Sequence, residues 1–132
     1  MSKNDDGPAG RDTVIIRVIP RPSDINHNGH IFGGWILSQM DIAGGVVAAH
    51  RAGGSVATVA IDRMKFVRPM LVGDWLSIYG EIAHIGVTSI TVHLDCRVRR
   101  EGVDGDLKVT EGAFVYVRID REGHPVPVEK LS

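Results

Sequence analysis

The chain has few of the features that mark several large classes of protein. It has a single cysteine, Cys96, so it forms no intrachain disulfide and no cysteine-based zinc site. This cysteine usage fits a reducing compartment, and we expect a cytoplasmic protein. Its 15 basic and 16 acidic residues leave a formal net charge of −1, which gives no electrostatic case for nucleic acid binding. A length of 132 residues allows one domain with a core that is stable without disulfides or metal.

The sequence also lacks a convincing targeting or membrane-spanning segment. Residues 1–12 are polar and contain Gly and Pro, so we predict a disordered leader followed by a single domain over residues 13–131. The longest apolar run, residues 31–49, approaches membrane-spanning length, but Gln39 and Asp41 lie near its centre. A central Asp costs about 2.5–3.5 kcal/mol on membrane-insertion scales. We therefore expect this run to be a helix inside a globular domain, with no membrane partner.

The order of periodic segments predicts an α+β fold. Residues 13–19 read as a strand, residues 21–30 as a loop, and residues 31–49 as a helix that ends near Gly53 and Gly54. Four strands with a period of two follow, over residues 56–67, 75–85, 87–99 and 107–119. A change of parity near Asp62 and Arg63 predicts a β-bulge. Because the connections are short, we expect a long helix laid against a curled antiparallel sheet.

The strand patterns indicate which side chains form the core. Alternation is cleanest in residues 87–99, where every second side chain is apolar and is predicted to face inward: Ile90, Val92, Leu94, Cys96 and Val98. In the last strand, Phe114 and Tyr116 are predicted to lie opposite the inward set. We expect these two aromatic side chains to serve contacts between dimers.

A helical wheel separates the helix into a bulky face and a face of small residues. The bulky face, predicted to pack on the sheet, holds Trp35, Ile36, Met40, Ala43, Val46 and Val47. The other face holds Gly34, Ser38, Asp41, Gly45 and Ala48. One sheet covers only one side of a helix, so a second subunit related by a two-fold axis is the simplest cover for the small face. Asp41, the one charged group there, is either a satisfied structural carboxylate or a catalytic one.

The start of the helix adds a feature typical of catalysis. Gly33 and Gly34 fall in the first turn, where main-chain amides have no acceptor within the helix. The helix dipole reinforces such amides, and together they can stabilise an oxyanion. Asp41 lies roughly 10–12 Å further along the axis at 1.5 Å per residue, which is too far for one carbonyl to contact both. The pattern therefore favours an active site shared between two subunits.

These residues resemble a known family. The run NHNGHIFGGWILSQMD, residues 26–41, is similar to the signature of the hotdog-fold acyl-CoA thioesterases of the YciA type, which include the cytosolic acyl-CoA hydrolases. The resemblance extends over residues 13–131. It implies a hotdog fold, in which a sheet wraps around a central helix, and homodimers that assemble further into tetramers or hexamers. It also implies hydrolysis of acyl-CoA thioesters, with coenzyme A as part of the substrate and no cofactor.

The resemblance assigns roles by position. Asp41 is implied to be the catalytic carboxylate, acting as a general base on water or as a nucleophile, with Asn26 from the facing subunit as its partner. Gly33 and Gly34 supply the oxyanion-binding amides. Many relatives carry an Asp where this chain has His30, which changes the chemistry of the loop.

Four further residues are candidates for binding the substrate. Arg63, Lys65 and Arg68 lie near the end of the strand after the helix and are suited to the phosphates of coenzyme A. The competing interpretation is that they form a solvated strand edge. Ser38 lies on the same small face as Asp41.

Other interpretations remain open at this point. His27 and His30 have metal-ligand spacing but lack a third ligand nearby, so we expect solvated loop histidines and no metal. A hotdog dehydratase or hydratase would use a loop histidine, here His27, with the helix carboxylate. A non-catalytic acyl-CoA-binding module would bind the thioester without turnover.

Overall fold

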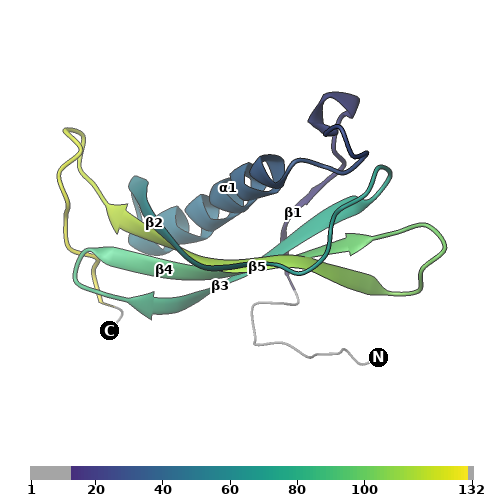
Figure 1. Ribbon diagram of the computed structural model, residues 1–132. Coiled ribbons are helices and arrows are strands. Elements are labelled where there is room, and N and C mark those ends of the chain that lie inside the picture. The colour runs from purple at the N-terminus through teal and green to yellow at the C-terminus, as the bar shows by residue number, and fades with distance from the viewer. Residues whose placement is uncertain (1–12, 131–132) are drawn as a thin grey trace.

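The structure, a computed structural model, describes residues 13–130 and consists of one helix on one face of a five-stranded sheet (Figure 1). The elements run in the order β1 (Val14–Val18), a short 3-10 helix (Pro22–Asp24), α1 (Gly33–Ala52), β2 (Val56–Phe66), β3 (Trp75–Ile85), β4 (Ser89–Arg99) and β5 (Asp106–Arg118). The predicted leader and Leu131 lie outside the described residues. No helix within residues 13–130 is long and apolar enough to cross a membrane.

The sheet is antiparallel throughout, and its strand order is β1-β3-β4-β5-β2. β2, which directly follows the helix, therefore lies at one edge beside β5, and β1 lies at the other edge. In Figure 1 the sheet curves below α1, which lies along its concave side. The predicted α+β class, with a long helix against a curled antiparallel sheet, is confirmed.

The predicted segments match the observed elements closely. The helix ends at Ala52, and Gly53 adopts a left-handed conformation with φ 71°, which closes the last turn through its N–H to the carbonyl of Ala49. The predicted bulge is also confirmed: the β2–β5 register shifts between Asp62 and Lys65, and Arg63 has a positive φ of 54°. β4 begins two residues later than predicted, at Ser89.

The core lies between the helix and the concave face of the sheet. All five β4 side chains predicted to face inward are buried, and so are Ile36, Met40 and Ala43 of the helix. Four orientations were predicted wrongly. Val46 is exposed, Ala48 of the predicted small face is buried in the core, and Phe114 and Tyr116 are buried beneath α1. Phe114 pairs with Val92, and Tyr116 pairs with Ile90, so both aromatics share the inward face of β4. They are core residues and do not serve contacts between dimers.

Candidate active site

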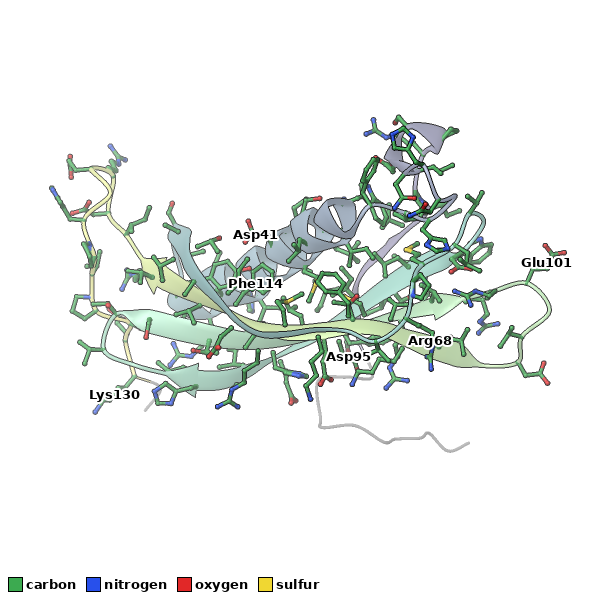
Figure 2. The ribbon with its side chains drawn as sticks, viewed as in Figure 1. Asp41, Arg68, Asp95, Glu101, Phe114 and Lys130 are labelled. Carbon is green, nitrogen blue, oxygen red and sulfur yellow. The ribbon has the colours of Figure 1, made fainter. Side chains whose placement is uncertain are left out.

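The Asp41 carboxylate is held by two hydroxyl groups. The Thr58 hydroxyl of β2 donates to Oδ1 of Asp41 at 2.7 Å. The Tyr116 hydroxyl of β5 lies 3.1 Å from the same oxygen and 2.9 Å from the Asp41 main-chain oxygen. Figure 2 labels Asp41 on the helix, above Phe114 in the layer between helix and sheet. Within residues 13–130 Oδ2 accepts no hydrogen bond, so one carboxylate oxygen stays open to solvent or a ligand.

The start of α1 presents uncapped amides, as predicted. Phe32 precedes the helix and provides no side-chain cap, and no partner for the Gly33 and Gly34 amides occurs in the part of the chain that the structure describes. Both glycines are exposed. A hollow of about 350 Å³ lies beside them, bounded by the loop before the helix and by the segment that follows β2. Two of its lining residues are Gly33 and Asn26, which the sequence assigned to the site.

The loop conformation fixes the direction of the Asn26 side chain. Its Oδ1 accepts the main-chain N–H groups of Asn28 at 2.9 Å and His30 at 3.1 Å. The Asn26 N–H donates in turn to the His30 carbonyl at 2.7 Å. Because the side-chain oxygen is occupied, the Asn26 amide NH2 is the group left for a ligand, and it is a hydrogen-bond donor.

The cations that the sequence grouped together lie in two places. Arg63 and Lys65 line a hollow of about 440 Å³ that also has His84, His93 and Glu111 in its wall. Arg68 instead lines the hollow at the start of the helix, and its guanidinium donates to the main-chain oxygen of Lys108 at 2.7 Å.

The remaining predicted polar residues have simpler surroundings. The Ser38 hydroxyl donates to the Trp35 carbonyl at 2.7 Å and is exposed. His30 lines the hollow beside Asn26, whereas His27 is exposed in the loop and does not line it. Among the described residues, one group of three side chains has metal-ligand spacing, and it lies elsewhere, at Asp120, Glu122 and His124.

Two residues of the site were not predicted from the sequence. Thr58 was read only as part of a strand, and Tyr116 was assigned to the wrong face. One available signal was Gly44, a glycine inside a helix, where glycine costs about 1 kcal/mol relative to alanine. It lies next to the Tyr116 ring, so a close approach by a large side chain explains its presence.

Large apolar side chains near the site are exposed. Ile42 and Val46 of α1, together with Val59 and Ile61 of the edge strand β2, are each about half exposed or more. Large exposed apolar side chains and a free strand edge are typical of a surface that a partner covers. Ile42 follows Asp41 and Val59 follows Thr58 in the chain, and Thr58 donates its hydroxyl to Asp41.

Comparisons with known proteins give consistent results. The profile of the thioesterase superfamily matches residues 28–104. The acyl-CoA thioester hydrolase YciA of Salmonella typhimurium is 39% identical over 131 residues, which cover 97% of each chain. The structure resembles a hexameric broad-specificity acyl-coenzyme A thioesterase, solved with an aspartate replaced by alanine, with a TM-score of 0.85 at 36% identity over 89% of this chain and 87% of that one. It also resembles the hexameric thioesterase y2039 from Yersinia pestis, with a TM-score of 0.85 at 37% identity over 93% of this chain and 98% of that one.

Proposed function

The chain belongs to the thioesterase superfamily and hydrolyses acyl-CoA thioesters, and we propose that Asp41 is the catalytic carboxylate of a site shared between two subunits. One observation carries this proposal: Oδ1 of Asp41 is held by hydroxyl groups, while Oδ2 accepts no hydrogen bond within residues 13–130. A carboxylate fixed through one oxygen presents the other in a defined direction. An aspartate is also the residue replaced in the hexameric thioesterase compared above.

Asp41 acts through Oδ2 in either of two ways. As a general base it takes a proton from water, and the hydroxide adds to the thioester carbonyl carbon. As a nucleophile it adds to that carbon itself and forms a mixed anhydride, which water then hydrolyses. In both cases the C–S bond breaks, coenzyme A leaves as a thiolate that takes up a proton, and the fatty acid is released.

Amide donors at the start of the helix stabilise the oxyanion. The main-chain amides of Gly33 and Gly34 point away from the helix and are reinforced by its dipole. Asn26 lines the same hollow as Gly33, and its NH2 group adds a third donor. Because its oxygen is held by the loop, Asn26 donates to the carbonyl oxygen and does not accept from water.

The two halves of the site come from different subunits. Asp41 lies about two turns of helix, roughly 10–12 Å, beyond Gly33 and Gly34, so one thioester carbonyl does not contact both within a subunit. A two-fold axis beside β2 joins the two edge strands and covers Ile42 and Val59. Three such dimers give the hexamer that the compared thioesterases form.

The coenzyme A moiety is bound by cations near the start of the helix. Arg68 lies in the same hollow as Asn26 and is the first candidate for a phosphate contact. Arg63 and Lys65 remain candidates through their own hollow, and Ser38 through its position one turn before Asp41. The reaction needs only water besides the thioester, so we propose turnover without a cofactor or metal. A cytoplasmic location, suggested by the single cysteine, also remains a proposal.

Thiol release from acyl-CoA tests the role of Asp41. Replacing Asp41 with Asn or Ala removes the base or nucleophile, so hydrolysis falls at least a hundredfold while folding, followed by circular dichroism, is retained. Asp104→Asn, in the exposed hairpin after β4, is the matched control and keeps wild-type turnover. Wild-type turnover by a folded Asp41→Ala variant contradicts the proposal.

The same assay separates the two alternatives. A dehydratase that uses His27 loses its activity in a His27→Ala variant, whereas the proposed thioesterase keeps thiol release. A binding module takes up acyl-CoA, measured by calorimetry, and releases no thiol. His27 does not line the hollow that contains Asn26, which favours the thioesterase.

A further inference from the structure

Tyr116 is a buried side chain whose hydroxyl, within residues 13–130, hydrogen-bonds only to Asp41. Its ring is 1% exposed and packs beside Phe114, with ring centroids 6.4 Å apart. The hydroxyl lies 2.9 Å from the Asp41 carbonyl oxygen and 3.1 Å from Oδ1. Both acceptors of its one hydrogen therefore belong to the residue that carries the open carboxylate oxygen.

The hydroxyl is not required to fill the core. Phenylalanine occupies the same kind of place two residues earlier, at Phe114, and would bury a ring without a polar atom. A buried phenol is costly unless it is hydrogen-bonded. Burial and, after it, the charge and hydrogen bond of Asp41 raise the pKa of Tyr116 well above its ordinary value. The raised pKa keeps the phenol protonated near neutral pH, so the hydroxyl is a hydrogen-bond donor there.

Gly44 makes room for this hydroxyl. A Cβ at position 44 would overlap the Tyr116 hydroxyl oxygen and lie 3.0 Å from two ring carbons. The helix thus keeps a glycine in its interior, at a cost of about 1 kcal/mol relative to alanine, where the phenol passes. Two features that are unfavourable on their own, a buried hydroxyl and a glycine inside a helix, are therefore in contact next to Asp41.

Resting on the proposed function, we infer that Tyr116 is a positioning residue for Asp41, and that Gly44 is the residue that admits it. The Thr58 and Tyr116 hydroxyls approach Oδ1 from two strands, β2 and β5, that pair with each other. Together they fix the rotation of the carboxylate, so that Oδ2 faces the substrate. Without Tyr116, Thr58 alone leaves the carboxylate free to turn about its bonds.

The test begins with Tyr116→Phe, which keeps the ring and removes only the hydroxyl. We expect kcat for acyl-CoA hydrolysis to fall about tenfold, with KM changed less than about twofold, because a hydrogen bond to the reacting carboxylate is lost while the substrate contacts stay. Tyr79→Phe, the same change at the half-buried tyrosine of β3, is the matched control and leaves kcat unchanged. A hydroxyl that serves stability alone would lower the melting temperature and leave kcat as it was, which overturns the inference.

Gly44→Ala provides a second and independent variant. In the wild-type background the added methyl group pushes the hydroxyl away, so kcat falls about as much as in Tyr116→Phe. Adding Gly44→Ala to Tyr116→Phe lowers kcat by a smaller factor than Gly44→Ala does alone, because the overlapping oxygen is gone and only the two ring carbons at 3.0 Å still have to shift. If the reductions in kcat of the two single variants multiply fully in the double variant, the inference is contradicted.

The role of Asp41 is judged separately. If Asp41→Ala abolishes hydrolysis and Tyr116→Phe leaves kcat intact, the positioning role fails and the proposed function stands. If Asp41→Ala keeps wild-type kcat, the proposed function fails first, and the positioning role falls with it.

Discussion

The buried ion pair between Asp74 and Arg100 supports the loop that carries Asn26. Asp74 is 1% exposed, and Arg100 donates to it through Nε at 3.0 Å and Nη2 at 2.8 Å. The Leu71 N–H also donates to this carboxylate, at 2.9 Å. Leu71 forms a β-bridge with His30, in the loop that Asn26 closes. Loss of Arg100 should therefore weaken both the fold and the hollow at the start of the helix.

Arg100→Met isolates this contribution. Methionine keeps the apolar length of the side chain but leaves the Asp74 carboxylate buried with Leu71 as its remaining donor. Breaking a buried pair costs about 3–5 kcal/mol. We expect the lower end, about 3 kcal/mol of unfolding free energy, because the Arg100 side chain is 22% exposed and water reaches it.

Urea unfolding at one fixed protein concentration measures this loss, since assembly also contributes to apparent stability. A loss of 3 kcal/mol lowers the midpoint by about 1–3 M for slopes of about 1–3 kcal/mol/M. Arg99→Met is the control: that side chain is 67% exposed, its Nε lies 3.5 Å from Asp106, and such pairs contribute about 0–1 kcal/mol. Equal losses of unfolding free energy in Arg100→Met and Arg99→Met would refute the reasoning.

Three further predictions concern other parts of the molecule. Burial raises the pKa of the Cys96 thiol, so it should react with Ellman's reagent only after unfolding, and rapid reaction of the folded protein would contradict its core position. The hydrogen bond from Lys108 lowers the pKa of Glu111, so the stabilising effect of the Glu111 carboxylate is fully present above the ordinary value of about 4.5 and is lost as the pH falls through the lowered pKa. Glu111→Gln should therefore reduce the fall in melting temperature on acidification below the ordinary value, measured by thermal unfolding across that range. Val59→Lys places a charge on the edge strand, so we expect a smaller species on size-exclusion chromatography and lower hydrolysis, whereas Val103→Lys in the distant hairpin keeps the assembly.

The sequence predicts most of the fold because its periodic segments are long. The β4 alternation identifies five core side chains correctly, and the parity change in β2 locates a bulge at Asp62 and Arg63. Both signals are local, since each depends on which face of its own strand a residue occupies. Gly53 likewise ends the helix through its own left-handed conformation.

The orientation of Tyr116 could not be read from its own strand. Apolar residues occupy both faces of β5, including Val115 and Val117, so its period does not distinguish inside from outside. The register between β5 and β4 determines the face on which Tyr116 lies, because Tyr116 pairs with Ile90 and shares its buried face. The contact with Asp41 follows from that long-range pairing.

For a related reason, the sequence did not predict that Arg68 lies apart from the other two cations. Arg63 and Lys65 lie two residues apart and line one hollow together. Arg68 lies beyond the end of β2, where the chain turns toward the start of the helix. Spacing in sequence predicts proximity only while the strand continues.

The most direct test of a site shared between subunits mixes two inactive variants. Asp41→Ala and Asn26→Ala are each expected to lose hydrolysis, so each is refolded alone and in an equal mixture with the other. A mixed dimer has one site with both substitutions and one site with neither.

Random pairing makes half of the dimers mixed, and half of their sites intact, so the mixture should recover about a quarter of wild-type thiol release. Recovery to that level supports donation of Asp41 and Asn26 by different subunits. A mixture that exchanges subunits, shown by mass spectrometry, yet stays as inactive as either variant alone would contradict the shared site.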